Sequence, residues 1–164
     1  MNEILEHEGV QRVRVALQSA GAAAEVIVLD ATARTAEDAA KALGVELGAI
    51  VKSLVFQVGN RFALALVAGD HRCVEAKLAP VLFIQGAVRK AEAGEVKFAT
   101  GFSIGGVAPV GLARSLPVVI DRSLKRFETL YAAAGHPHAV FPTTVEELKR
   151  LTGGIVSYAI AEPR

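Results

Sequence analysis

The sequence predicts a domain of the α/β class, α+β type, with a mixed, largely antiparallel sheet or barrel that is curled and flanked by helices. Three observations support this prediction. Strand-like and helix-like patterns alternate irregularly, without the regular βαβ repeat of a doubly wound sheet. Two apolar, β-rich runs flank Gly59-Asn60, which is typical of an antiparallel hairpin. Neither G-x-G-x-x-G after the first expected strand nor G-x-x-x-x-G-K-[ST] occurs, which argues against a nucleotide-binding doubly wound fold.

The N-terminal elements follow from local signals. Apolar residues at helical spacing over 5–17 predict a first helix that ends near Gly21. Residues 25–29 are rich in β-branched residues and read as a strand. Residues 35–38, Thr-Ala-Glu-Asp, resemble a capping box and should begin a second helix that stops at Gly44.

The rest of the chain continues this alternation. The expected strands are residues 50–58, 61–67, 116–121, 130–134, 138–141 and 155–160. The expected helices are residues 74–81, 91–100 and 144–151, and residues 87–89 could form a further strand. The last helix has the clearest signal, because Thr144-Val145-Glu146-Glu147 fits a capping box in residue type and spacing.

Composition limits the classes of protein. The 164 residues suit one domain, residues 1–164, and 52% hydrophobic with 21% charged residues is ordinary for a soluble globular protein. No apolar run is long enough to span a bilayer, so no membrane contact is expected. The single cysteine, Cys73, excludes an internal disulfide and suits a reducing, cytoplasmic location. A formal charge of +1 argues against broad nucleic-acid binding but allows contact with a few phosphates at an RNA end.

The segment 101–111 reads G-F-S-I-G-G-V-A-P-V-G and holds four of the 15 glycines. Ser103 is its only hydroxyl, so the segment offers mainly backbone groups. Consecutive N–H groups in such a loop can bind an anion or an oxyanion. The alternative is a long turn that only joins two elements.

Lys52 is the first side chain that could carry chemistry. On a strand over 50–58, alternate residues share a face, so Lys52 would lie beside the apolar Ile50, Leu54 and Phe56, with Ser53 on the opposite face. A lysine on that face must extend its charged end to water, pair with an acid or line a pocket, and the alternative is that Lys52 sits at the strand end and reaches water. In a pocket it would bind phosphate or carboxylate, or donate a proton.

His136 is the second candidate, because it lies in a Gly-His-Pro turn between two expected strands. The alternative is an exposed turn histidine. His7 and His71 are expected at the surface, and the four histidines lack metal-ligand spacing, so no metal site is expected. Cys73 and His71 are expected to flank a turn, which leaves Cys73 structural and the chain without a catalytic triad.

Three separated segments resemble one family. The first runs from Thr35 to Ala40 and continues through Leu43-Gly44-Val45 to Ile50-Val51-Lys52-Ser53-Leu54. The second is the loop 101–111, which is similar to the pattern G-x-x-x-G-G-[VI]-x-P-x-G. The third combines Ala134-Gly135-His136 with residues 144–148 and 151–153. Together they resemble the YbaK-type aminoacyl-tRNA deacylases, free-standing relatives of the editing domain inserted in bacterial prolyl-tRNA synthetase. The similarity extends from Thr35 to the C-terminus.

The resemblance implies a barrel-like mixed α/β fold and a trans-editing hydrolase that serves translation fidelity. Such an enzyme cleaves the ester between a small wrong amino acid and tRNA, often tRNA for proline. Its partner is the tRNA 3′ acceptor end, and no cofactor is implied. Whether the protein acts alone or docked on prolyl-tRNA synthetase, and in which oligomeric state, stays open.

The resemblance also implies roles for residues. Lys52 would hold the tRNA 3′ end, and Gly105 and Gly106 would supply backbone N–H groups near the scissile carbonyl while substrate and backbone orient the water. His136 would help shape the amino-acid pocket. The further substrate-binding residues would be Arg34, Thr35, Ser53, Gly101, Ser103, Ile104, Val107 and Pro109.

Two departures leave the amino acid open. Several members have an aromatic residue where this chain has Arg34, and some have asparagine or threonine where it has Ser53. Alanine, cysteine, serine and threonine all stay candidates. The competing hypothesis is a binding module of the same fold that sequesters aminoacyl-tRNA, a synthetase or a small ligand without turnover. A sequence-reading DNA-binding protein is poorly supported, because no recognition-helix pattern stands out.

Overall fold

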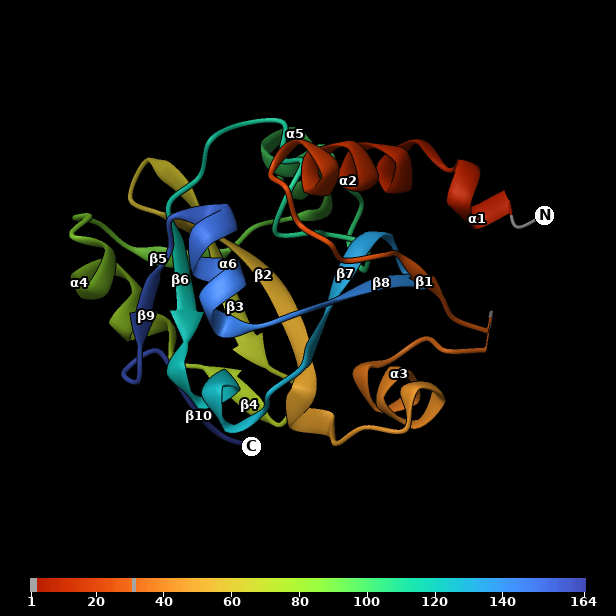
Figure 1. Cartoon of the computed structure of the whole chain (residues 1–164). Helices are drawn as coiled ribbons and strands as arrows, with labels where there is room; N and C mark the ends of the chain where they lie inside the picture. Colours follow the sequence, from red (N-terminus) through yellow and green to blue (C-terminus); the bar gives the residue numbers. More distant parts are fainter. Residues whose placement is uncertain (1–2, 31) are drawn as a thin grey trace.

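The computed structural model describes residues 3–30 and 32–164 (Figure 1). The helices are α1 Glu3–Glu6, α2 Glu8–Ser19, α3 Ala36–Leu43, α4 Leu78–Leu82, α5 Ala93–Thr100 and α6 Val145–Thr152. The strands are β1 Ile27–Val28, β2 Ile50–Val58, β3 Arg61–Ala68, β4 His71–Cys73, β5 Val88–Lys90, β6 Val118–Asp121, β7 Leu130–His136, β8 Ala139–Thr143, β9 Ile155–Ser157 and β10 Ala161–Pro163. Three short 3₁₀ turns are η1 Leu47–Ala49, η2 Glu75–Lys77 and η3 Arg122–Arg126.

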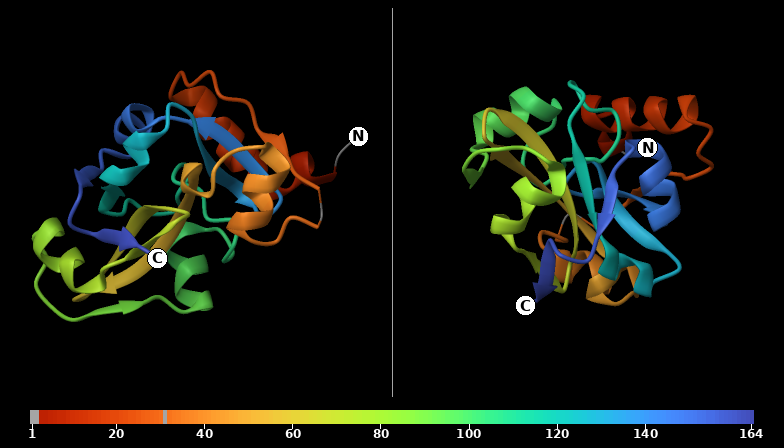
Figure 2. Two further views of the ribbon diagram at one scale, coloured as in Figure 1. Left: turned by 90° about the horizontal axis from the view of Figure 1, so that it is seen from below. Right: turned by 90° about the vertical axis from the view of Figure 1, so that its left-hand side faces the viewer.

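An eight-stranded mixed sheet forms the centre of the molecule, and its strands twist strongly across the two views of Figure 2. Its order is β1-β8-β7-β2-β3-β6-β9, with β5 also paired to β2. The β2–β7, β3–β6 and β6–β9 pairs are parallel, and the remaining pairs in this sheet are antiparallel. The predicted mixed α/β class is therefore confirmed, with an open rather than closed strand order among the described residues.

Two apolar layers cover the two faces of this sheet. One layer joins alternate residues of β3, such as Leu64 and Leu66, to α2, α5 and α6. The other joins Ala65 and Val67 to Leu78 of α4. This alternation is the period of two that a strand imposes on its side chains. Because β2 pairs with β3, the same alternation determines on which face of the sheet each side chain of β2 lies.

The capping signals correctly located two helices. The Thr35 hydroxyl accepts from the Asp38 N–H at 3.1 Å at the start of α3, and the Thr144 hydroxyl accepts from the Glu147 N–H at 3.0 Å at the start of α6. Both helices end at a glycine with left-handed backbone, as expected. These caps fix where α3 begins, which matters because that point borders the candidate site.

Two expectations about His71 were wrong. His71 and Cys73 both lie on β4, which pairs with β10, instead of flanking a turn. His71 is also buried rather than at the surface. Strands of three residues are too short to show a period of two, and their pairing depends on the distant C-terminal segment. The expected strand 155–160 correspondingly ends at Ser157, before β10 begins.

The described residues lack two further features. Within 3–30 and 32–164, no helix has the length and apolar character to cross a membrane. The same part of the chain contains no group of three or more His, Cys, Asp or Glu side chains placed to hold a metal ion.

Candidate active site

The candidate site lies where the edge of β2 is left uncovered. The parallel neighbour β7 pairs with β2 only at Ile50 and Val51, and the antiparallel neighbour β5 pairs only from Phe56 to Val58. Between them, residues 52–54 have a strand partner only on the β3 side within the part of the chain that the structure describes. A cavity of about 340 Å³ opens at this gap.

Three segments that are far apart in the sequence line this cavity. They include seven of the predicted site residues: Arg34, Thr35, Lys52, Ser53, Ile104, Gly105 and Val107. The start of α3, the middle of β2 and the glycine-rich loop thus meet at one place. The turn between β7 and β8 closes the cavity through Pro137, and Tyr131 of β7 also lines it.

Ser53 presents unused polar groups at the gap. Its hydroxyl oxygen is buried and has no hydrogen-bond partner among the described residues. Val55 accepts from the Ala91 N–H at 3.0 Å on the β5 side of the strand. Because alternate residues of a strand direct their N–H and C=O groups to the same side, the backbone groups of Ser53 point into the gap. Ser53 therefore directs a backbone donor and a backbone acceptor at the gap, beside its buried hydroxyl.

Lys52 lies on the opposite face of β2, as predicted, and is among the residues that line the cavity. Its ammonium donates a hydrogen bond to the His71 carbonyl oxygen. An ammonium has three N–H donors, so two remain for a ligand. Burial lowers the pKa of Lys52, and Arg164 lowers it further, while Asp121 and Asp70 oppose the shift.

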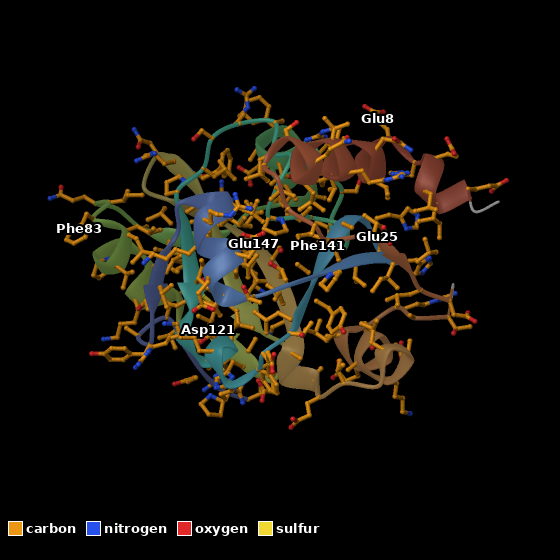
Figure 3. The ribbon with its side chains drawn as sticks, viewed as in Figure 1. Glu8, Glu25, Phe83, Asp121, Phe141 and Glu147 are labelled. Atoms are coloured by element: carbon orange, nitrogen blue, oxygen red, sulfur yellow. The ribbon has the colours of Figure 1, made fainter. Side chains whose placement is uncertain are left out.

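A polar network holds the Gly69-Asp70 turn and the start of β4, where the His71 carbonyl accepts from Lys52. Asp70 accepts two hydrogen bonds from the Arg126 guanidinium, at 2.7 and 2.9 Å, and a further contact joins it to the His71 ring at 2.9 Å. The Arg126 hydrogen bonds hold the pKa of Asp70 well below its ordinary value. Asp121, at the end of β6 (Figure 3), accepts from Ser123 Oγ at 2.8 Å and from the Ala68 N–H at 3.0 Å.

The two adjacent glycines of the loop differ in what they can offer. Gly105 lines the Lys52 cavity, has φ +93°, and its N–H has no acceptor among the described residues. The Gly106 N–H already donates to the Ser103 carbonyl at 3.0 Å. A Cβ at Gly106 would lie 2.8 Å from the His136 backbone nitrogen, so only glycine allows the loop to approach the β7–β8 turn this closely.

The remaining predicted residues lie outside the Lys52 cavity. Gly101, Ser103, Gly106 and His136 line a second cavity of about 280 Å³. Burial lowers the pKa of His136, and the neighbouring His7 and His138 lower it further. The structure therefore does not bring His136 to the Lys52 cavity.

Pro109 is buried and lines a third cavity, together with residues such as Ala16 and Leu151. Sequence reasoning missed Tyr131 and Pro137, which both line the Lys52 cavity. The sequence feature that could have indicated Pro137 is the Gly-His-Pro turn, in which it directly follows His136. Tyr131 had none, because its position depends on the parallel pairing of β7 with Ile50.

Residues 30–151 match the model of a family described as the aminoacyl-tRNA editing domain. The chain belongs to this family. The editing domain is YbaK-like and is related to the editing domain of prolyl-tRNA synthetase. Its most informative structural relative is a solved structure described as a candidate trans-editing enzyme for prolyl tRNA synthetase. That structure is 40% identical, superposes with a TM-score of 0.89, and covers 95% of this chain and 98% of its own.

Sequence relatives agree with this placement. The uncharacterized protein YwhH of Bacillus subtilis (strain 168) is 35% identical over 78% of this chain and 81% of that protein. A proline–tRNA ligase of Xanthomonas oryzae pv. oryzae is 41% identical over 57% of this chain, but the match spans only 16% of the ligase. The editing domain therefore corresponds to one part of that larger enzyme.

Proposed function

We propose that this editing domain is a deacylase that hydrolyses mischarged aminoacyl-tRNA in trans, with tRNA for proline carrying a small wrong amino acid as its substrate. One observation carries the proposal. The cavity at the uncovered edge of β2 unites Lys52, Ser53 and Gly105, three residues that the family resemblance had assigned to substrate from two separate segments. The description of the 40% identical structure as a candidate trans-editing enzyme supports the same reaction.

The proposed reaction is attack by water on the ester carbonyl carbon. The acyl C–O bond breaks, the ribose oxygen takes up a proton, and free amino acid and tRNA leave. The unpaired Gly105 N–H would donate to the carbonyl oxygen as negative charge develops on it. Gly106 would act by holding the loop against the β7–β8 turn, because its own N–H is engaged within the loop.

Lys52 would bind the tRNA 3′ end through the two ammonium protons that are not bonded to His71. The Asp70–Arg126 pair would hold the start of β4, and with it the His71 carbonyl that accepts from Lys52, in place. The attacking water would be oriented by the substrate and by backbone groups. Ser53 is the best-placed candidate for this contact, because its carbonyl faces the gap beside Gly105.

The walls of the cavity favour a small amino acid. Val107, Ala133, Ala139 and Val140 contribute apolar surface, and the buried Ser53 hydroxyl is a polar group without a partner among the described residues. A pocket separates substrates that differ by one methylene only modestly, whereas an unpaired polar group discriminates more strongly. Polar small side chains such as serine, cysteine or threonine therefore stay alongside alanine as candidates.

The proposal is tested with tRNA for proline charged separately with alanine, cysteine, serine, threonine and proline. Loss of one or two mischarged species with prolyl-tRNA spared is expected, with many product molecules per protein. At most one bound ester per protein, with no free amino acid released, would instead support a non-catalytic binding module. A folded sample that neither binds nor hydrolyses any of these esters would refute the assigned substrate.

A further inference from the structure

The second cavity, of about 280 Å³, is lined by Gly101, Ser103 and Gly106 of the glycine-rich loop, and Ser53 is not among its lining residues. Pro137 lines both cavities, and the adjacent Gly105 and Gly106 each border one of them. A chain whose last residue lies in the Lys52 cavity can therefore reach the second cavity by crossing the loop at this point. The volume is just below the roughly 300 Å³ at which pockets for drug-sized ligands begin, so the cavity suits a small group.

The lining of the second cavity is rich in hydrogen-bond donors. Lys97 is exposed, and its ammonium donates to the Gly101 carbonyl at 3.1 Å. Arg12 donates to the Gly101 and Thr100 carbonyls at 2.9 and 3.0 Å and to the Gly111 carbonyl. Among the described residues, neither cation is paired with a carboxylate, so both charges stay uncompensated.

Two imidazoles add donors of the same kind. The His7 Nδ1 accepts from the Gly9 N–H at 3.1 Å, and the His136 Nδ1 accepts from the His138 N–H at 3.0 Å. Each neutral ring must therefore carry its proton on Nε2, which leaves an N–H donor. The ring centroids of His7 and His136 are 5.0 Å apart, so both rings belong to one wall.

Acidic groups are sparse at this cavity. Among its lining residues, Glu8 is the only carboxylate, and it is exposed at the start of α2 (Figure 3). Two cations without a carboxylate partner among the described residues and two imidazole N–H donors outnumber this one carboxylate, and this excess of donors favours an anion with several acceptor oxygens. A phosphodiester has this chemistry.

We infer that the second cavity binds a backbone phosphate of the single-stranded RNA that precedes the esterified 3′ nucleotide. The inference rests on the proposed function, because the 3′ nucleotide must occupy the Lys52 cavity for the RNA to run this way. Arg12 holds the loop and contributes charge, while Lys97 and the two imidazoles contact the phosphate. RNA phosphates contribute affinity independently of base sequence, so this subsite serves binding strength rather than the choice of amino acid.

Lys97→Glu tests the inference, with Lys149→Glu as its matched control. Both lysines are exposed, lie in the last turn of an eight-residue helix, and give the same change in net charge. The first measurement is binding of an uncharged single-stranded RNA ending in CCA, by fluorescence anisotropy. Lys97→Glu should weaken binding about tenfold and lower the slope of log affinity against log salt by about 0.7, while Lys149→Glu matches the wild type.

The second measurement compares hydrolysis of aminoacyl-tRNA with hydrolysis of a 3′-aminoacyl adenosine that has no phosphate. Lys97→Glu should reduce kcat/KM more for the tRNA than for the nucleoside. Equal losses with both substrates, equal RNA binding by the two variants, or no RNA binding by the wild type would overturn the inference. Inorganic phosphate that binds in a Lys97-dependent way while RNA does not would identify a free-anion site and would equally overturn it.

These measurements separate the two proposals. RNA binding needs no ester, so it tests the phosphate subsite even where no hydrolysis occurs. Hydrolysis with no dependence on Lys97 would leave the proposed function standing and remove the subsite.

Discussion

Ser53→Ala should stabilise this protein while it weakens the proposed reaction. The Ser53 hydroxyl is buried without a partner among the described residues, and an unsatisfied buried polar group costs about 1–3 kcal/mol. Removing the oxygen should therefore raise the free energy of unfolding by about 1 kcal/mol. For a chain of this size, that corresponds to a rise in Tm of about 2–4 °C.

Ser123→Ala is the matched control, because the Ser123 hydroxyl is satisfied. It donates to Asp121 Oδ2 at 2.8 Å and lies 3.3 Å from the His71 ring nitrogen. The same deletion there should lower the free energy of unfolding by about 1 kcal/mol, so the two serines should shift Tm in opposite directions. Thermal unfolding by circular dichroism measures both shifts.

The activity of the Ser53 variant completes this test. If the hydroxyl binds the substrate amino acid, Ser53→Ala should lower kcat/KM for deacylation about tenfold despite the higher Tm. A Tm that falls as far as that of Ser123→Ala would show that the Ser53 hydroxyl is already satisfied in the free protein. That result would refute the argument that it is held for a ligand.

Three further predictions follow from the same structure. Gly106→Ala places a Cβ 2.8 Å from the His136 nitrogen, so Tm should fall by about 3–10 °C and deacylation should fall with it; an unchanged Tm would show that the loop can shift freely. Asp70 has a lowered pKa, so its contribution to stability is present above about pH 4 and is lost as the pH falls below that value. The fall of Tm with acidification should therefore be shallower in Asp70→Asn than in the wild type. Parallel curves of Tm against pH for the two proteins would contradict this. Burial raises the pKa of Cys73 to about 11 from 9.0, so alkylation at pH 8 should be about a hundredfold slower in the folded than in the unfolded chain, and equal rates would contradict burial of the thiol.

Local signals in the sequence predicted much of the fold. The β2–β3 hairpin has a nine-residue, mainly apolar strand and a Gly-Asn turn. The helix caps at Thr35 and Thr144 are hydrogen bonds between residues three positions apart in the sequence. The pairing of β4 with β10 could not be predicted in this way. It joins His71 to Pro163, and neither three-residue strand carries a periodic pattern.

The candidate site shows the same division. Lys52, Ser53 and Gly105 were predicted and do line one cavity. The separation of His136 into a second cavity was not predicted, because it depends on how the loop packs against the β7–β8 turn. The gap itself could not be predicted from the sequence, because it arises from the pairing of β7 and β5 with different parts of β2.

Multiple-turnover deacylation of mischarged tRNA by Lys52→Ala tests the central claim most directly, with Lys149→Ala as the exposed-lysine control. The account predicts that Lys52→Ala keeps its fold by circular dichroism and loses hydrolysis by about a hundredfold or more, whereas Lys149→Ala matches the wild type. A folded Lys52→Ala protein that hydrolyses the ester at the wild-type rate would contradict it.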